Sequence, residues 1–432
     1  MGLELAWGAP GMLRGATWAI AAVATAGVII RPWRLPEFVW AVTGAAILVL
    51  AQLLQPFDAW QGIRKGTDVY LFLIGMMLLA EVARSEGLFD WLASHAASHA
   101  RGSATRLFTL VYLVGTLVTV FLSNDATAVV LTPAVAAVVR AAKAANPLPF
   151  LLICAFIANA ASFVLPISNP ANLVIYGSHM PPLLEWLPRY ALPSLASILA
   201  TYAALWLTQR NALRQPVAAV AETPPLSTGG RVAAAGIVLT ALVLMAASAL
   251  DWQLGLPTCV AGALTAAIVT LAARQSPWPV IKDISWGVLP LVAGLFVLVE
   301  ALDRTGVIRA VGDWLRQAEA WSPSGATWAV GASLGVLCNL MNNLPTGLIA
   351  GTAVQAAHTS PQVTGAVLLG IDIGPNLSVT GSLATILWLA ALRRDGLHVS
   401  ARDFLRIGAV VMPAALLPAL AVLSLGWVIG AG

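Results

Sequence analysis

The sequence contains few charged residues. Asp, Glu, Lys and Arg make up only 10% of its 432 residues, whereas 59% are hydrophobic. A soluble domain carries roughly 25% charged residues, so this chain cannot cover itself with a hydrated surface. Lysine is especially scarce, at three of the 23 basic residues, and no basic run occurs. We therefore expect neither an ordinary soluble protein nor a nucleic-acid partner.

Cysteine and histidine are scarce too. Cys154, Cys259 and Cys338 lie in apolar stretches without metal-ligand spacing, which excludes a disulfide framework. The histidines are scattered, and the one pair at i, i+4, His95 and His99, lies in a predicted loop with no obvious third ligand. The sequence has no Gly-x-x-x-x-Gly-Lys nucleotide-binding loop. We expect no enzyme, metal or cofactor, and any ATP dependence would come from a partner protein.

Long apolar runs are present instead, from end to end. Runs of about 18 residues or more are long enough to cross a bilayer core of roughly 30 Å, and helices satisfy their own backbone in lipid. The predicted spans lie near 12–30, 36–54, 69–84, 150–178, 190–208, 232–250, 257–274, 285–303, 364–392 and 407–430. The sequence therefore predicts an all-α integral membrane protein.

Two further segments, 107–140 and 326–357, are long and apolar but are interrupted in the middle by polar residues. We expect each to be a re-entrant hairpin, whose two ends lie on the same side of the membrane. The alternative, in which each segment crosses the membrane twice, gives the same sidedness and stays open.

The two halves of the sequence resemble each other at an offset near 215 residues. The pattern from Glu81 to Leu88 matches the pattern from Glu300 to Val307. Asn124-Asp125 in the first interrupted segment matches Asn342-Asn343 in the second. Each half holds five crossings plus one hairpin, and this odd number turns the second half upside down relative to the first. The sequence therefore predicts two inverted repeats.

The first repeat is expected to span residues 1–208 and the second residues 232–432, joined by a cytoplasmic linker at 209–231. Each repeat also contains a helix that polar residues, Pro and Gly break near its middle, at 150–178 and at 364–392. Such matching breaks in two halves indicate the binding site of a transporter, near the membrane midplane.

Basic residues are distributed unevenly between the loops on the two sides. The loops at 31–35, 84–106, 140–149, 209–231, 274–284 and 393–406 carry 16 Lys and Arg, and the opposite set carries 7. The positive-inside rule places the first set in the cytoplasm and both termini outside. The hairpin 107–140 then enters from the cytoplasm and the hairpin 326–357 from outside. We expect a multi-pass protein of a bacterial or archaeal cytoplasmic (inner) membrane, surrounded by lipid.

Four polar clusters coincide with the four breaks. Non-helical backbone at membrane depth is tolerated only where it is buried in protein or lines a watery cavity. The residues predicted to bind a small solute are Ser123, Asn124, Asn159, Ser162, Ser168, Asn169, Asn342, Asn343, Thr346, Asn376, Thr380 and Ser382. The alternative is that these side chains cap helices and hold them together.

Asp125 and Asp372 are predicted to couple transport to protons. An ionisable group within a span costs at least about 2.5–3.5 kcal/mol on insertion scales and is by default a functional hypothesis. No Lys or Arg lies close in sequence to either aspartate. The alternative is a hydrogen-bonded structural carboxylate. Glu81 and Glu300 each have an arginine one turn further on, which favours a structural ion pair.

At these clusters the sequence resembles the ArsB arsenite efflux family, within the wider ion transporter superfamily. The resemblance rests on Asn-Asp-Ala-Thr-Ala from Asn124, Phe-Ile-Ala-Asn-Ala-Ala-Ser from Phe156 and Met-Asn-Asn-Leu-Pro-Thr from Met341. It continues in Asp-Ile-Gly-Pro-Asn from Asp372 and covers nearly the whole chain. Members often have an aspartate at the position of Asn159 and a lysine at that of Asn376, so a pair of opposite charges is absent here.

The resemblance implies export of trivalent arsenite and antimonite, in exchange for protons, and in some organisms with an ATPase partner, ArsA. At neutral pH arsenite is mostly the uncharged triol As(OH)3, which suits hydroxyl, amide and carboxylate groups. Cys154 and Cys338 are candidate thiol ligands, although a lone buried cysteine is commonly a small hydrophobe. The rival hypotheses are a sodium-coupled carboxylate symporter or sodium/proton antiporter of the same fold, and a passive channel.

Overall fold

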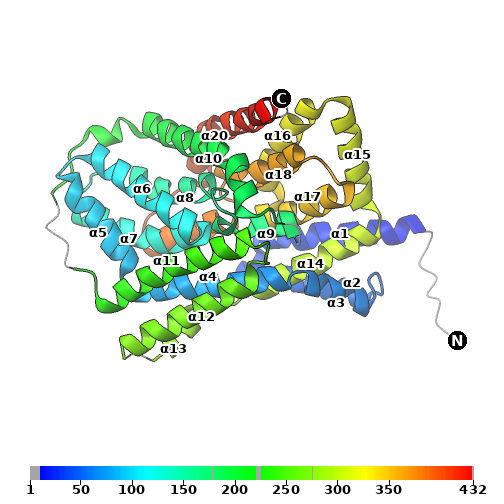
Figure 1. Cartoon of the computed structure of the whole chain (residues 1–432), viewed down its shortest axis with the longest axis horizontal. Helices are drawn as coiled ribbons and strands as arrows, with labels where there is room; N and C mark the ends of the chain where they lie inside the picture. The colour runs from blue at the N-terminus through cyan, green and yellow to red at the C-terminus, as the bar shows by residue number, and fades with distance from the viewer. Residues whose placement is uncertain (1–9, 178–179, 220–224, 275, 431–432) are drawn as a thin grey trace.

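The computed structural model describes residues 10–177, 180–219, 225–274 and 276–430, and it is built from helices throughout these ranges (Figure 1). The first half contains α1 (Pro10–Ile30), α2 (Glu37–Leu50), α3 (Pro56–Lys65), α4 (Thr67–Ser85), α5 (Leu88–Ala100), α6 (Ala104–Phe121), α7 (Thr132–Ala141), α8 (Leu148–Ala160), α9 (Pro170–Tyr176) and α10 (Leu183–Gln209). The second half contains α11 (Thr228–Ala249), α12 (Gly255–Ala272), α13 (Trp278–Asp283), α14 (Val288–Arg304), α15 (Val307–Trp321), α16 (Pro323–Met341), α17 (Asn343–Ala357), α18 (Pro361–Ile373), α19 (Leu383–Arg394) and α20 (Ala401–Gly430).

Parts of the predicted segments lie outside the described residues. These parts are 1–9 and 431–432 at the ends of the predicted repeats, 178 at the end of the first broken helix, and 220–224 within the predicted linker.

The predicted all-helical membrane protein is confirmed. Within the described residues, eight helices are long and apolar enough to cross a membrane, or nine if α3 and α4, bent by 47° at their junction, form one span. Helix α2, the segment 126–141 and helix α8 are apolar but shorter. Short helices at membrane depth need partners at their ends, because lipid offers the backbone no hydrogen bonds.

Two segments expected to be loops are helical instead. His95 and His99 lie on α5, within the predicted loop 84–106, and the polar stretch after Arg304 forms α15. In α15 the buried residues Ile308, Gly312 and Leu315 share one face, while charged residues occupy the other. This is the pattern of an amphipathic helix. A search for long apolar runs does not detect such helices.

Each of the four interrupted segments consists of two helices separated by a break. Helix α8 ends at Ala160 and α9 begins at Pro170, and α18 ends at Ile373 before α19 begins at Leu383. Helices α6 and α7 are separated by residues 122–125 and a π-helical turn at Ala126–Leu131. Helices α16 and α17 are separated at Asn342, whose φ of 70° lies in the left-handed region.

Helices from the two halves of the chain pack closely against one another. Helix α4 contacts α12, α14 contacts α2, and the two long helices α10 and α20 lie side by side (Figure 1). Glycine permits the α4–α12 contact, because a Cβ on Gly75 would collide with the carbonyl of Thr258 and one on Gly262 would collide with the backbone of Gly75. Neither half therefore forms its helix packing alone.

We expect Gly75→Val to destabilise the protein, because the added side chain has to push α12 away from α4. Overpacking of this kind costs typically about 1–3 kcal/mol. The matched control is Gly15→Val on α1, where an added Cβ meets nothing within 4 Å. The midpoint of thermal unfolding in detergent measures both variants. Equal midpoints would contradict the close α4–α12 contact.

Candidate functional site

Two of the cavities bordered by described residues reach into the helix bundle. The larger, the Asp125 cavity, has a volume of about 560 Å³ and is lined by Ser123, Asp125, Pro170 and Leu383, among other residues. The smaller, the Lys65 cavity, has a volume of about 440 Å³ and is lined among others by Lys65, Glu300 and Thr352.

The two cavities lie at opposite ends of α4 and α14. The Asp125 cavity contacts α4 from Leu73 to Arg84 and α14 only at its first residue, Val288. The Lys65 cavity contacts the first turn of α4 and, on α14, the stretch from Phe296 to Asp303 near its end. Because α4 extends over 19 residues, or roughly 28 Å at 1.5 Å per residue, the cavities open on opposite faces of the helix bundle.

The Asp125 cavity reaches the first, second and fourth helix breaks. Asp125 is partly exposed there, in the break between α6 and α7. The Ser123 hydroxyl accepts a hydrogen bond from the backbone N–H of Ala126 at 3.1 Å. The side-chain Oδ1 of Asn124 accepts one from the backbone N–H of Asp125 at 2.9 Å. Pro170 and Leu383, the first residues of α9 and α19, complete this end. Of the predicted site residues, Ser123 and Asp125 line the cavity.

An ion network lies along the wall of the Asp125 cavity. Arg84 Nε donates to both carboxylate oxygens of Glu81, at 3.1 and 2.9 Å, and its Nη2 donates to Asp283 on α13 at 3.0 Å. The Glu81–Arg84 pair was predicted from the sequence, whereas the contact with Asp283 was not. Arg394 and Asp395 at the end of α19 also line this cavity.

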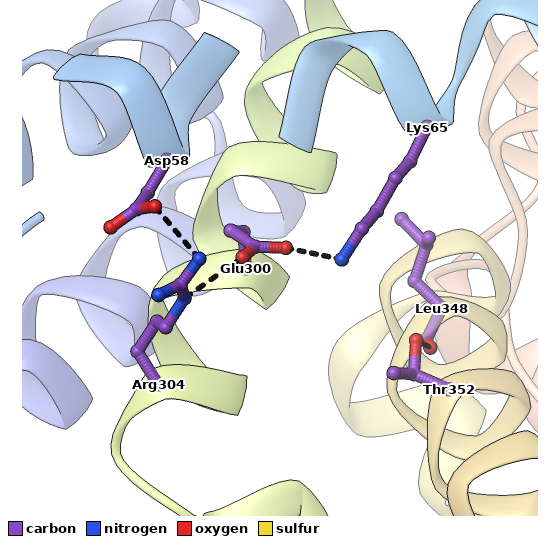
Figure 2. A network of polar contacts seen from close by, with 6 residues as sticks. All are labelled: Asp58, Lys65, Glu300, Arg304, Leu348 and Thr352. Carbon is purple, nitrogen blue, oxygen red and sulfur yellow. Dashed lines mark hydrogen bonds and ion pairs between the residues drawn. The ribbon is translucent and has the colours of Figure 1, made fainter. Parts of the chain in front are cut away.

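A similar network borders the Lys65 cavity (Figure 2). Glu300 accepts from Lys65 Nζ at 2.5 Å and from Arg304 Nε at 3.1 Å, and Arg304 Nη2 donates to Asp58 at 2.7 Å. Figure 2 shows Thr352 of α17 on the other side of Lys65. The Glu300–Arg304 pair was predicted, but Lys65 and Asp58 were missed. The sequence did contain a signal for Asp58: it lies shortly before α4, which carries Glu81, just as Asp283 lies shortly before α14, which carries Glu300.

A buried pair of amides joins the second break to the fourth. Asn159 Nδ2 donates to Asn376 Oδ1 at 3.0 Å and lies 3.4 Å from the Thr385 hydroxyl. Asn376 Nδ2 in turn donates to the Phe156 carbonyl at 3.1 Å. Asn159 and Asn376 are the two positions where the sequence departs from the resembled family, and they are in direct contact.

Asp372 is fully buried, in contrast to Asp125. Its Oδ1 accepts a hydrogen bond from Asn169 Nδ2 at 2.7 Å, and its Oδ2 has no hydrogen-bond partner among the described residues. Asn169 also caps α9, because its Oδ1 accepts from the Ala171 N–H at 3.0 Å. Asp372 does not line the Asp125 cavity or the Lys65 cavity. The structure therefore places one predicted carboxylate in a cavity and the other in the protein interior.

The remaining predicted residues form hydrogen bonds either between two breaks or within one of them. Asn342 Nδ2 donates to the Thr380 carbonyl at 3.3 Å, and the Asn343 N–H donates to the Gly381 carbonyl at 2.8 Å. Two further hydrogen bonds join different segments: the Ser168 hydroxyl donates to the Val120 carbonyl at 2.9 Å, and the Thr380 hydroxyl donates to the Asn339 carbonyl at 2.9 Å. Three are local: the Thr346 hydroxyl donates to the Asn342 carbonyl at 2.7 Å, the Ser162 hydroxyl donates to the Asn159 carbonyl at 2.8 Å, and the Ser382 hydroxyl accepts from the N–H of Thr385 at 3.1 Å. All four breaks thus meet in one region.

Asn339 has a larger structural role than the sequence suggested. Its Nδ2 donates to the carbonyls of Gly335 and Gly374 at 2.8 and 2.9 Å, and its Oδ1 accepts from the Ser378 N–H and hydroxyl.

Cys154 and Cys338 are buried, and neither thiol lines the Asp125 or the Lys65 cavity.

A multi-span helical protein with polar helix breaks between cavities on opposite faces has the architecture of a secondary transporter. The chain belongs to the CitMHS family, which is described as citrate transporter and whose family model matches residues 22–375. This chain is a membrane transporter rather than an enzyme.

Relatives at modest identity extend over almost the whole chain. The arsenical pump membrane protein of Escherichia coli is 26% identical over 409 residues, covering 89% of this chain and 93% of that protein. A Mycobacterium tuberculosis protein named an uncharacterized transporter is 27% identical over 415 residues, covering 91% and 94%.

Two solved structures share the fold. The YdaH transporter of Alcanivorax borkumensis superimposes with a TM-score of 0.58 at 15% identity, over 86% of this chain and 88% of that chain. MtrF of Neisseria gonorrhoeae gives a TM-score of 0.52 at 12% identity, over 89% and 84%. These similarities support the fold, and they carry no information on the substrate.

We expect Asn159→Leu and Asn376→Leu each to lower the free energy of unfolding, because each leaves a buried polar partner unpaired. Such a loss costs about 1–3 kcal/mol. The double variant should lose less than the sum of the two, because the residues share one hydrogen bond. Asn211→Leu, at an exposed position, is the control and should change stability by no more than about 0.5 kcal/mol. Strict additivity in chemical denaturation would show that the pair is not coupled.

Proposed function

We propose that this protein exports trivalent arsenite and antimonite from the cytoplasm of a bacterium or archaeon in exchange for protons. The observation that carries the proposal is the partly exposed carboxylate of Asp125, which lines a cavity together with Ser123, Pro170 and Leu383 at the helix breaks. The arsenical pump relatives support the same substrate.

The proposed architecture is a pair of inverted repeats, each with five crossings and one re-entrant hairpin. Contacts between helices at matching positions support it, since α4 packs on α12 as α14 packs on α2, and α6 packs on α8 as α16 packs on α18. The ion networks support it as well. The short helix before α4 supplies Asp58 to Arg304, and the short helix before α14 supplies Asp283 to Arg84.

In this architecture the Asp125 cavity opens to the cytoplasm and the Lys65 cavity to the outside. The cavity with Asp125 is bordered by Arg84, Asp283 and Arg394, which lie in or next to the loops rich in basic residues. The Lys65 cavity is bordered by segments of the opposite loop set. By the positive-inside rule, basic loops remain in the cytoplasm.

The chemistry of the four breaks suits a small neutral triol. Asn159, Asn169, Asn376, Ser382 and Thr385 provide hydrogen-bond donors and acceptors at or near the meeting point of the breaks. No Lys or Arg occurs in the four polar clusters. A tricarboxylate would need cationic partners there, because burying an uncompensated charge is costly. As(OH)3 needs none.

We assign proton coupling to Asp125 and Asp372. Asp125 exchanges protons with the cytoplasm through its cavity, and deprotonation there frees it to accept hydrogen bonds from As(OH)3. Asp372 takes up or releases a proton only when α9 and α18 separate, because Asn169 covers its Oδ1. Exchange of a neutral solute for a proton moves charge inward, so the membrane potential assists export.

The second candidate is a sodium-coupled carboxylate symporter of the same fold. The description of the family as citrate transporter favours it, and amide, hydroxyl and backbone oxygens also bind sodium. Arg84 is already paired with Glu81 and Asp283. Among the described residues that line the Asp125 cavity, Arg394 is then the cation that could bind a carboxylate substrate. Dependence of transport on sodium separates this candidate from the arsenite exporter.

We expect a thiol-reactive, membrane-impermeant reagent to label Val129→Cys from the cytoplasmic side and Thr352→Cys from the outside. Both positions line cavities and are partly exposed. The background lacks Cys154, Cys259 and Cys338, and Val354→Cys, buried at 2% exposure, is the unreactive control. Labelling is compared in everted and right-side-out vesicles. Both cysteines reacting from the same side would overturn the inverted arrangement.

We expect everted vesicles that contain the protein to accumulate arsenite when their interior is acid, without ATP and without sodium. Accumulation should collapse with an uncoupler. Asp125→Asn and Asp372→Asn should abolish uphill accumulation, because an amide cannot exchange protons, while Glu185→Gln at an exposed position should not. Unchanged pH dependence in both asparagine variants would end the proton-coupling proposal. Uptake only with ATP and an added ArsA-type ATPase would indicate a partner-driven pump instead.

A further inference from the structure

A basic pocket lies apart from both cavities, where α5 ends and α6 begins. Its volume is about 420 Å³, and it is lined by His99, Arg101, Thr105, Arg106, Thr109 and Leu110. Arg101, Thr105 and Arg106 are exposed. The pocket is therefore a site on the outer surface of the helix bundle, facing the membrane or its boundary with water.

The charge around this pocket is positive and uncompensated. Among the described residues, Arg101 and Arg106 form no ion pair. Asp125 is the only acidic residue between Trp91 and Leu184 in the sequence. The short turn Ala212–Arg214 after α10 packs against α6 and brings another arginine to this end of the helix. An anion bound here would be attracted by Arg101 and Arg106.

An apolar strip continues from the pocket along α6. Thr109 is followed at intervals of four residues by Leu113, Leu117 and Phe121, and these three side chains are 53%, 56% and 40% exposed. Residues four apart lie on one face of a helix. The twelve-residue interval from Thr109 to Phe121 corresponds to roughly 18 Å at 1.5 Å per residue. The basic pocket thus lies at the head of a strip that faces the hydrocarbon of the bilayer.

The other half of the chain lacks these basic residues at the matching positions. At the offset of 219 that relates Glu81 to Glu300, His99, Arg101 and Arg106 correspond to Ala318, Ala320 and Gly325. Helix α16 matches α6 and exposes Val336 and Leu340, so the apolar surface is present on both sides. The basic residues are present in the first half only. The basic pocket is therefore not simply a consequence of the fold that the two halves share.

We propose that this pocket binds the phosphate headgroup of an anionic phospholipid, whose acyl chain lies along Leu113 and Leu117. Basic pockets on the cytoplasmic side of membrane helices suit such headgroups. Arg101 and Arg106 contact the phosphate, and the exposed Thr105 offers a hydroxyl group, whereas the Thr109 hydroxyl is bonded to the Thr105 carbonyl and to Tyr202. Because Arg106 is in the first turn of α6, a bound phosphate also interacts favourably with the positive end of that helix.

The test is native mass spectrometry of the purified full-length protein with phosphatidylglycerol or phosphatidylcholine. We expect retained phosphatidylglycerol adducts that Arg101→Gln/Arg106→Gln weakens by about tenfold, which corresponds to ~1.4 kcal/mol. Arg14→Gln/Arg309→Gln removes the same charge from exposed positions elsewhere and should bind as the unmodified protein does. Arg101→Lys/Arg106→Lys keeps the charge and should retain the adducts, which guards against a folding defect in the glutamine variant.

Three results would overturn the proposal. Equal retention of phosphatidylcholine would show that the headgroup charge is not recognised. An equal loss of phosphatidylglycerol adducts in the Arg14→Gln/Arg309→Gln control would show that the lipid responds to the overall charge of the protein and not to this pocket. Displacement of the lipid by inorganic phosphate at matched concentration would identify a site for free anions, with no contribution from the apolar strip.

Discussion

Backbone groups that lie inside a membrane must find hydrogen-bond partners within the protein, and the rest of this structure depends on that requirement. Four helix breaks release N–H and C=O groups at membrane depth, where lipid provides no partners. Asn169 and Ser382 cap the helices that restart after two of the breaks, and Asn339 satisfies carbonyls of two segments at once. Because each break supplies partners to another, the four breaks must meet. The polar region that results is a candidate site in an otherwise apolar protein.

The packing of the two halves against each other positions the cavities around that region. Close contact through Gly75 and Gly262 holds α4 on α12, and Gly294 lies against Ala41 where α14 crosses α2. Helices α4 and α14 therefore each pack mainly against the opposite half of the chain. The ion networks also join the two halves of the chain, because Arg84 binds Asp283 beside one cavity and Arg304 binds Asp58 beside the other. As a result, the cavities occupy opposite ends of the same two helices.

Asp125 and Asp372 experience different environments. Asp125 follows a short break and faces a cavity, whereas Asp372 lies at the end of a buried helix with one oxygen bound to Asn169. Burying a carboxylate without a cation is costly, so the arrangement around Asp372 is sensitive to its proton. A carboxylate that lines a cavity and a second one that is fully buried give the proposed exchange two distinguishable steps. Asn159 and Asn376, which are bonded to each other in this region, contribute no charge to it.

The sequence alone determined the membrane class, most of the apolar helices and the positions of the four breaks. The length of an apolar run sets whether a helix can cross a bilayer, and Pro, Gly and Asn interrupt a helix locally. Glu81–Arg84 and Glu300–Arg304 were predictable for the same reason, because partners one turn apart need no tertiary information. Helices α5 and α15 were missed because their apolar residues follow a helical period without forming a run. Only the tertiary structure decided that Asn159 meets Asn376, that Lys65 and Asp58 join Glu300 and Arg304, and that Asp125 rather than Asp372 lines a cavity. Those contacts join residues far apart in the chain, and no local preference of either partner specifies which helix will lie opposite.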